Sequence, residues 1–449
     1  MELNCLKAIS PVDGRYHENT KELAEYFSEY ALIKYRVEVE IKWLIKLNDL
    51  VSEFDLTEDE KKSLQEISDS FNIEEAERVK EIESVTKHDV KAIEYYIREK
   101  VTGTPLHKVS SFIHFACTSE DISNLAYGLM AKNAISSIWL PEAEKLVLSI
   151  KEKSQELKGI PMLAHTHGQP ASPTTIGKEL MVFVYRFEHI LNILKTIKLT
   201  GKFGGAVGNF NAHNAAYPNL DWKNIGKSFV EGLGLEYAPL TTQIESHDTI
   251  CVIFNMVKSF NNILMDFNSD MWLYIANSYF TQKTVSTEVG SSVMPHKVNP
   301  INHENSMANI RISNAIFTSM ADNLPISRMQ RDLTDSSMQR NIGVAFAHSL
   351  LSIKQSIIGF EKMLVNENAL REDLNKNPEV LSEAIQTVLR KNGYIDAYEI
   401  LKKLTRGNRV TLEAIQEFIN ELEIPEEDKT VLLALTPETY IGIAKTLLD

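Results

Sequence analysis

The segment IFNMVKSFNNILMDFNSDM, residues Ile253–Met271, decides the fold class of this chain. After Ile253, its apolar residues follow at steps of four, three, four, three and four, which is the heptad spacing of one helix face. This stripe consists of Val257, Phe260, Leu264, Phe267 and Met271. Further apolar residues widen it, namely Val252, Met256, Ile263 and Leu273. A helix that is apolar on several sides is buried among several neighbours, so the segment predicts the core of a helical bundle.

Long helical patterns also occur elsewhere in the chain, at residues 176–199, 306–322 and 340–364. Strand-like alternation is not interleaved with them, which argues against a doubly wound parallel sheet. We therefore expect an all-α fold with a central bundle of long helices. Breaks at residues 102–105 and 375–378 indicate three domains. These are an N-terminal helical domain at 1–110, the central long-helix bundle domain at 111–364 and a C-terminal helical domain at 365–449.

The composition is that of a globular protein without a nucleic-acid or membrane partner. Of the 449 residues, 43% are hydrophobic, which is enough for a large core. The net charge of −14 is not offset by a basic stripe, which argues against nucleic-acid binding. No apolar run reaches the roughly 18 residues that cross a bilayer, and the first residues do not resemble a secretory signal. The three cysteines are too scattered for a disulfide framework or a zinc site, so we expect a cytoplasmic protein.

The stretch GSSVMPHKVNP, residues Gly290–Pro300, interrupts the helical pattern. Gly290 and Pro295 break regular structure, so we expect a loop between helices, where catalytic groups often lie. The loop carries two adjacent serines followed by a histidine, a lysine and an asparagine. A Gly-Ser-Ser alone is more often an ordinary linker, but a defined order of eleven residues is far more specific.

Four other polar segments interrupt the helices. They are SPVDGRY at residues 10–16, TKHDVKA at 86–92, HFACTSEDISN at 114–124 and THGQPASP at 166–173. Each alone has an ordinary structural explanation as a surface pair, a helix N-cap or a helix stop. In so acidic a chain, an anionic substrate needs a local cationic site, and two basic clusters qualify, Arg328–Arg340 and His296–Lys297.

Taken together in this order, these segments resemble the adenylosuccinate lyase branch of the aspartase/fumarase superfamily. Two further segments support this branch, TTQIESHD at residues 241–248 and RMQRDLTDSSMQRN at residues 328–341. Fumarases and aspartases share the serine loop but are not expected to carry the second of these segments. Argininosuccinate lyases typically have Gln-Lys-Lys where this chain has His296, Lys297 and Val298. One departure from the branch is Lys87, where an asparagine is common in close relatives.

The resemblance implies an enzyme that releases fumarate by β-elimination in purine nucleotide biosynthesis. Members of the branch split adenylosuccinate into AMP and fumarate, and split the succinyl-aminoimidazole-carboxamide ribotide in the same way. The resemblance implies no cofactor, no metal, anionic purine-nucleotide substrates and a homotetramer whose active sites each use polar segments of three chains. The alternative from another class is a non-catalytic structural descendant, which would have no reason to retain serine, histidine, lysine and asparagine together.

The resemblance also implies roles in the chemistry. Ser291 corresponds to the base and His167 to the acid, with Glu304 as the carboxylate that orients it. A serine hydroxyl is a weak base, so its surroundings must stabilise the alkoxide, whereas a histidine can deliver a proton near neutral pH. His88 is either a binding residue or a secondary participant, and the sequence does not decide between these roles.

Substrate binding is implied for residues of every polar segment. Arginine suits the phosphate end because it donates two parallel hydrogen bonds. The implied ribose-phosphate contacts are Arg15, Tyr16, Arg331, Ser336 and Arg340. The implied contacts to the succinyl group or to the purine base of the substrate are Thr118, Ser119 and Gln243. The implied substrate contacts on the serine loop are Ser292, Lys297, Val298 and Asn299. The remaining implied binding residues are Lys87, His88, Asp89, Asn305, Ser337, Met338 and Gln339.

Overall fold

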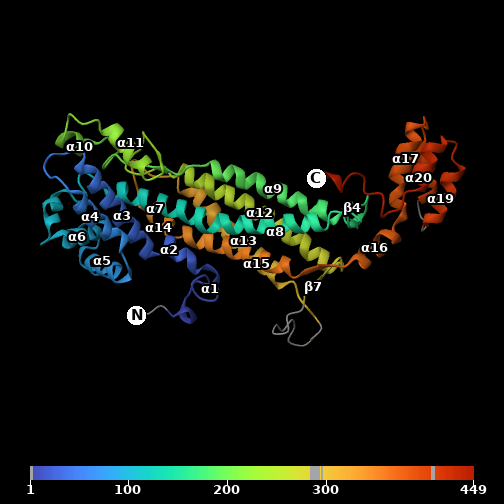
Figure 1. The fold of residues 1–449 in the computed structure, drawn as a ribbon, viewed down its shortest axis with the longest axis horizontal. Helices are drawn as coiled ribbons and strands as arrows, with labels where there is room; N and C mark the ends of the chain where they lie inside the picture. The colour runs from blue at the N-terminus through green and yellow to red at the C-terminus, as the bar shows by residue number, and fades with distance from the viewer. Residues whose placement is uncertain (1–3, 284–293, 295–296, 406–409) are drawn as a thin grey trace. The chain divides into compact units, whose positions relative to one another are not determined.

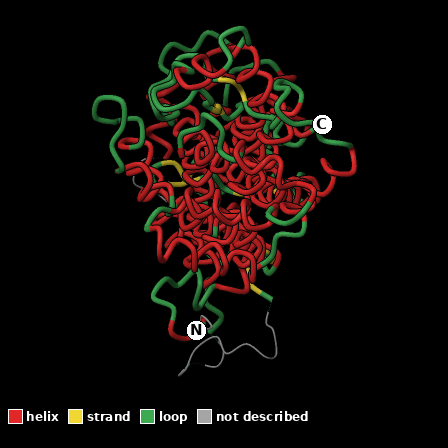
Figure 2. The backbone as a smooth tube through the Cα atoms, turned by 90° about the vertical axis from the view of Figure 1, so that its left-hand side faces the viewer, coloured by secondary structure: helices red, strands yellow, loops and turns green. Residues whose placement is uncertain are grey.

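The computed structural model describes residues 4–283, 294, 297–405 and 410–449 of the chain (Figure 1). Helices account for 67% of the structure, which confirms the all-α fold class. Helices also make up nearly all of the regular backbone in Figure 2, where strands occur only as short pieces.

The chain folds into two compact units. Unit 1 consists of Met1–Ala143, Ile190–Asn262 and Ser306–Lys354, and unit 2 consists of Glu144–His189, Ile263–Asn305 and Gln355–Asp449. Each unit is thus assembled from separate stretches of sequence. The division into three domains with boundaries near residues 110 and 364 stays a prediction.

Unit 1 contains the N-terminal helices and several polar segments. It begins with two short helices, α1 (His17–Thr20) and α2 (Ala24–Phe27). The longer ones that follow are α3 (Glu29–Asn48), α4 (Glu58–Asp69), α5 (Ile73–Thr86), α6 (Asp89–Val101) and α7 (Ser119–Ala134). Unit 1 also holds α10 (Asn211–Ala216), α11 (Trp222–Gly232) and α14 (Thr334–Gln339). Polar caps begin several of these helices; at the start of α5, for example, the Asn72 side chain accepts a hydrogen bond from the Glu75 N–H at 3.0 Å.

The long helices predicted from the sequence are confirmed. They are α9 (Ile176–Thr196), α12 (Asp248–Ala276), α13 (Ile301–Asn323) and α15 (Ile342–Glu361), and α8 (Leu140–Glu156) is a further long helix. All five stripe positions of α12 are 0% exposed, whereas Val252 and Leu273 on its other sides are 47% and 49% exposed. Phe260 of the stripe packs edge-on against Trp139, with ring centroids 5.1 Å apart. The heptad stripe therefore forms core, while other faces of α12 leave apolar side chains exposed in the single chain.

The described residues contain four separate two-stranded sheets, and these do not combine into one larger sheet. In unit 2, β1 (Pro161–Met162) pairs with β4 (Thr174–Thr175), β2 (His165–Thr166) with β3 (Gln169–Pro170), and β7 (Phe280–Gln282) with β8 (Met363–Val365), all antiparallel. In unit 1, β5 (Thr200–Gly201) and β6 (Glu236–Tyr237) are parallel. Such short strands position the loops beside them, and those loops carry candidate site residues.

Two helical stretches have the length and apolar composition of a membrane span. They are α12 and Thr334–Glu361, which comprises α14 and α15. Within their apolar windows, 50% of the first and 72% of the second are buried inside the fold. The core helices of globular bundles have the same composition, so these stretches are weak indicators of a membrane.

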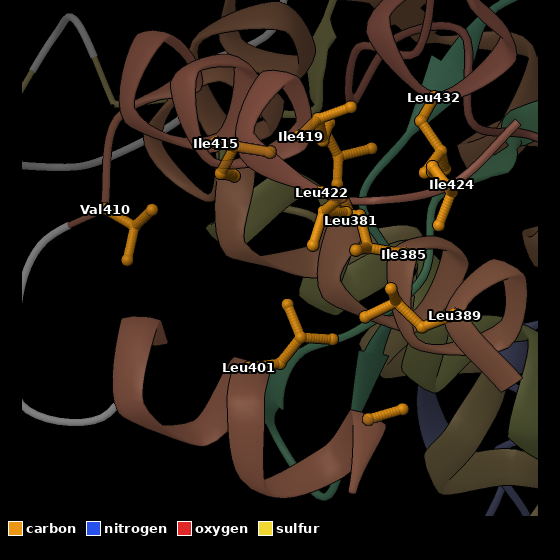
Figure 3. Packing of buried hydrophobic residues seen from close by; sticks show 11 residues of the cluster. Leu381, Ile385, Leu389, Leu401, Val410, Ile415, Ile419, Leu422, Ile424 and Leu432 are labelled. Atoms are coloured by element: carbon orange, nitrogen blue, oxygen red, sulfur yellow. The ribbon is translucent and has the colours of Figure 1, made fainter. Parts of the chain in front are cut away.

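The C-terminal part of unit 2 has its own hydrophobic cluster (Figure 3). After α16 (Glu367–Lys376), it contains α17 (Ser382–Lys391), α18 (Ala397–Thr405), α19 (Leu412–Glu421) and α20 (Glu426–Leu433). α17 buries Ile385 and Leu389, and α19 buries Ile415 and Ile419. Residues four apart share one helix face, so each short helix buries a single apolar side against its neighbours.

Candidate active site

Unit 1 holds a cavity of about 130 Å³ at which three of the polar segments meet. The predicted site residues that line it are His88, Asp89, Ser119, Arg331, Ser336 and Gln339. It is also lined by residues that the sequence analysis missed, among them Arg36, Glu120, Ser123, Tyr127 and Asp335. These residues come from α3, the starts of α6 and α7, and the region of α14, which are distant in sequence and meet only in the folded unit.

Lys87 and His88 form the turn between α5 and α6. Lys87 ends α5 in the left-handed conformation, with a φ of 54°. His88 caps α6, because its Nδ1 accepts a hydrogen bond from the Lys91 N–H at 3.1 Å. With Nδ1 as acceptor, a neutral His88 ring carries its proton on Nε2. The side chain is 53% exposed, so Nε2 can serve as a donor at the edge of the cavity.

Asp89 is held by two arginines. Its Oδ2 lies 2.9 Å from Arg36 Nη1 and 3.5 Å from Arg340 Nη2. Burial favours the neutral carboxyl, but the Arg36 charge and the hydrogen bonds outweigh it and lower the pKa of Asp89. Arg36 is buried in the middle of α3 and also donates to Ser123 Oγ at 3.1 Å. An arginine among the apolar positions of a helix is the signal that could have identified it, since a buried charge requires a partner.

A buried ion pair anchors the start of α7. The Asp121 carboxylate accepts hydrogen bonds from the N–H groups of Thr118, Gly204 and Gly205 at 2.8, 2.8 and 3.0 Å. It also lies 2.8 Å from Lys202 Nζ, and both side chains are fully buried. Lys202 donates in turn to the Gly205 carbonyl at 2.7 Å. These bonds fasten a glycine-rich loop to the predicted binding residues at the start of α7, and a single lysine in such a loop carries no pattern that the sequence reveals.

Gln243 joins this glycine-rich loop to Arg331. Its Nε2 donates to the Ala206 carbonyl at 3.0 Å, and its Oε1 accepts from Arg331 Nη1 at 3.2 Å. Gly208, with a φ of 80°, permits the close approach of the two segments, because a Cβ there would lie 2.4 Å from the Thr241 carbonyl oxygen. Two predicted binding residues that are 88 positions apart thus belong to one polar network.

Beside Arg331 lies a buried group of carboxyls with one histidine. Arg331 Nη2 is 3.3 Å from Glu120 Oε2. His247 Nε2 is 3.4 Å from Asp335 Oδ2, and the Gln339 amide nitrogen is 3.2 Å from the same ring nitrogen. Burial raises the pKa of Glu120 to about 7. Burial opposes protonation of His247, but its hydrogen bond to Asp335 and the surrounding carboxylates raise its pKa.

Arg331, which lines this cavity, and Arg340, which lies beside it, each have carboxylate partners within the chain. Arg331 pairs with Glu120, and Arg340 pairs with Asp89 and, at 3.8 Å, with Glu29. A carboxylate partner fixes the position of each arginine but cancels part of its charge. The sequence could not reveal this compensation, because the partners belong to other segments.

α14 carries the rest of the predicted phosphate-binding segment. The Ser336 N–H donates to Asp335 Oδ1 at 2.7 Å, and the Ser336 carbonyl accepts from Arg340 Nη1 at 3.4 Å. Ser337 is exposed and Met338 is half-buried. Of Ser336, Ser337 and Met338, only Ser336 lines the cavity described above, together with Asp335 and Gln339 of the same helix.

Arg340 also lies beside the N-terminal turn that contains Arg15 and Tyr16. It lines a second cavity, of about 270 Å³, together with Val12 and Asp13 of that turn. Arg15 is exposed and Tyr16 is half-buried. The structure thereby brings the first polar segment of the chain next to the last one.

In unit 2, His167 lies at the tip of a β-hairpin. β2 and β3 flank a two-residue turn of His167 and Gly168, whose φ angles are 55° and 72°. Two positive φ angles are what a tight hairpin turn requires. Glycine adopts such an angle without strain, and histidine does so more readily than most residues. The turn leaves the His167 side chain exposed.

The other predicted residues of unit 2 lie around the start of α13. Glu304 Oε1 accepts a hydrogen bond from Trp272 Nε1 at 3.1 Å, and Glu304 makes no bond to His167 within the described part of one chain. The exposed residues here are Lys297 and Val298, and the half-buried ones are Asn299 and Asn305. Ser291, Ser292 and His296 lie outside the described residues. Within the described ranges, no group of three or more histidine, cysteine, aspartate or glutamate side chains is arranged to hold a metal ion.

Comparison with known proteins defines the family. Residues 14–313 match a family model described as lyase, and residues 327–441 match one described as adenylosuccinate lyase C-terminal. The adenylosuccinate lyases of Haemophilus influenzae and Escherichia coli are each 49% identical to this chain, over 100% of it and 99% of their own length. The chain belongs to the adenylosuccinate lyase family. The resemblance inferred from the signature segments is confirmed, and the protein is a lyase of the aspartase/fumarase superfamily.

Solved structures of other proteins share the fold of this adenylosuccinate lyase family member. A fumarate lyase from a Mesorhizobium species superposes with a TM-score of 0.78 at 18% identity, with 96% of each chain covered. A β-carboxy-cis,cis-muconate cycloisomerase from Acinetobacter calcoaceticus superposes with a TM-score of 0.73 at 16% identity, again with 96% of each chain covered. At such low identity these similarities concern the fold, and they confirm an architecture common to enzymes of different activity.

Proposed function

We propose that this protein cleaves adenylosuccinate to AMP and fumarate by β-elimination. We propose the same reaction for the succinyl-aminoimidazole-carboxamide ribotide, which loses fumarate to give the aminoimidazole-carboxamide ribotide. The observation that carries the proposal is the full-length identity of 49% to adenylosuccinate lyases. The cavity of unit 1 supports it, because arginine donors and the starts of α6 and α7 line it together, and helix N-termini favour anions.

The chemistry requires a base, an acid and a group of donors. A base removes a proton from the carbon next to a carboxylate, and the carbanion charge spreads onto that carboxylate as a doubly charged aci-carboxylate. Preorganised donors must stabilise this charge. The carbon–nitrogen bond then breaks, its electron pair leaves with the nitrogen, and an acid protonates that nitrogen while the double bond of fumarate forms.

We assign these roles as the family resemblance implies. Ser291 is the base and His167 the acid, with Glu304 orienting the acid. Lys297 and Asn299, at the end of the serine loop, are the donors for the aci-carboxylate, since an ammonium and an amide both present N–H groups. The exposed position of His167 at a hairpin tip leaves its ring able to reach a substrate.

The proposed activity is tested by adding adenylosuccinate to the purified protein and following its ultraviolet absorbance. AMP and fumarate should appear in equal amounts. Argininosuccinate and malate serve as control substrates, because they are the substrates of the rival lyases. Turnover of a control substrate without turnover of adenylosuccinate contradicts the assignment.

Arg331→Ala should weaken substrate binding. It removes a charge-assisted hydrogen bond of about 1.5–3 kcal/mol, which corresponds to a roughly ten- to hundredfold higher dissociation constant. Arg328→Ala is the matched control, because Arg328 belongs to the same segment but is exposed and pairs with Asp332. The loss at Arg331 should shrink for a substrate analogue that lacks the phosphate, and an equal loss for both compounds places Arg331 elsewhere in the site.

We further propose a cytoplasmic homotetramer. Each of the long helices α9, α12, α13 and α15 leaves large apolar side chains exposed in the single chain, for example Tyr185, Val252, Ile312 and Ile358. Repeated exposure of this kind along core helices is typical of a surface that is buried by other copies of the chain. The three cysteines are all unpaired, which agrees with a reducing compartment.

Analytical ultracentrifugation should give a mass near four chains. Mixing His88→Gln and Ser291→Ala proteins under conditions of subunit exchange should then raise the activity above that of either variant alone, because some mixed sites combine two intact segments. Mixing two batches of the same variant is the control. A fully active monomer, or no recovery after demonstrated exchange, rules out active sites shared between chains.

A further inference from the structure

In the cavity of unit 1, the arginines pair with carboxylates of the same chain. Glu120 Oε2 lies 3.3 Å from Arg331 Nη2, and Asp89 Oδ2 lies 2.9 Å from Arg36 Nη1. A phosphate that binds Arg331 adds about two negative charges next to Glu120. Like charges at such short range in a partly buried site repel each other strongly unless one of them is neutralised.

Glu120 is the carboxyl best placed to be neutralised. Its side chain is buried near the start of α7, 3% exposed, and it faces charged groups from every element packed around it. These groups are Arg331 and Asp335 from the α14 region, His247 just before α12, Lys202 from the glycine-rich loop, Arg36 from α3, and His88 and Asp89 at the start of α6. The next residue of α7, Asp121, pairs with Lys202. Burial, together with the nearby Asp335 carboxylate, already raises the pKa of Glu120 to about 7.

The charges around Asp89 differ from those around Glu120. Two guanidiniums hold its carboxylate, and the Arg36 charge lowers its pKa in spite of burial. Asp335 bonds to His247, whose pKa is raised, so this pair is internally compensated. Added negative charge in the cavity therefore acts first on Glu120.

We propose that Glu120 is a proton-exchanging counter-ion of Arg331, which takes up one proton from solvent when a phosphate-bearing anion binds in this cavity. This inference rests on the proposed function, and it adds a linked proton to the binding of the nucleotide. No covalent bond of the substrate or the chain's backbone is broken. The proton adds to a Glu120 oxygen, and Arg331 exchanges its ion pair with that carboxylate for an ion pair with the phosphate. The resulting neutral carboxyl also has an O–H that can donate, whereas a carboxylate only accepts.

Isothermal titration of the intact enzyme with AMP measures the linked proton. At pH 8, the observed binding enthalpy is plotted against the ionisation enthalpy of several buffers, and its slope should correspond to an uptake of about 0.9 proton. Near pH 6, where Glu120 is already protonated, the uptake should fall towards zero. At pH 8 the AMP phosphate is a dianion, with its second pKa near 6, so it contributes little. Adenosine, which lacks the phosphate, should bind with no uptake.

Variants assign the proton to a residue. Glu120→Gln should bind AMP with a proton uptake near zero. From pH 6 to pH 8, the dissociation constant of the wild type should rise about tenfold more than that of this variant. His88→Gln should keep the uptake. Infrared difference spectra of wild-type enzyme with ¹³C-labelled glutamate provide a test without any variant, and AMP should produce a shifted band of a protonated carboxyl.

Two results overturn the inference. One is AMP binding by the wild type without proton uptake, which leaves the proposed function intact if adenylosuccinate is still cleaved. The other is uptake that survives in Glu120→Gln, or that vanishes in His88→Gln, because the proton then belongs to another group. An enzyme that neither binds AMP nor cleaves adenylosuccinate instead contradicts the proposed function itself, and the inference fails with it.

Discussion

Ser291→Ala should lower turnover of adenylosuccinate by at least about 10²–10⁴-fold, the usual contribution of a general base. In the proposed mechanism this hydroxyl, as an alkoxide, takes the proton from the carbon next to the carboxylate. Alanine removes one oxygen atom and is not expected to disturb the fold. The variant should therefore keep the oligomeric state and the melting temperature of the wild type.

Substrate binding separates this role from a structural one. The lysine and asparagine of the loop remain in Ser291→Ala, so the dissociation constant of intact adenylosuccinate should change little. Ser292→Ala is the matched control and should reduce turnover less, because Ser292 is expected to contact substrate and not to abstract the proton. If both serines only shape a turn, the two variants should show small and similar effects, and a Ser291→Ala turnover within tenfold of wild type ends the claim that Ser291 is the base.

His167→Gln should lower turnover by about two to four powers of ten while substrate binding survives. The leaving nitrogen needs a proton, and an amide side chain cannot supply one. Because His167 is exposed at a hairpin tip, the fold should tolerate the change. His167→Asn is a second variant matched to the backbone, since asparagine readily adopts the positive φ of 55° found there.

His88→Gln decides between the two candidate acids. The His88 ring accepts a hydrogen bond at Nδ1, so its neutral form carries a proton on Nε2 and has the chemistry of a donor. If His88 only binds substrate, its replacement should mainly raise the dissociation constant. Near wild-type turnover in His167→Gln combined with an inactive His88→Gln would falsify the assignment of the acid to His167.

The fold could be predicted because its signals are local or periodic. The heptad spacing from Ile253 to Met271 gives one α-helix with a buried face, whatever its neighbours are, since residues three and four apart share a side of the helix. The same argument located α9, α13 and α15. The compact units were not predictable in this way, because each is assembled from stretches far apart in sequence whose packing no local pattern encodes.

The candidate site was predictable where its residues form ordered motifs. His88, Asp89, Ser119 and Arg331 belong to such motifs, and the structure places all four on one cavity. The residues that hold them carry no motif. The sequence shows Arg36 only as a charge among the apolar positions of a helix, and its partner Asp89 lies 53 positions away in sequence.

The sequence by itself determined the helical fold class, the family and the residue types that the chemistry needs. Only the tertiary structure decided how those residues are charged and held. Glu120 could be assigned to a helix N-cap motif from sequence, yet its burial, its bond to Arg331 and the nearby Asp335 change its protonation. The physical reason is that electrostatic energies depend on distance and on burial, and in this chain both are set by segments that meet only when it folds.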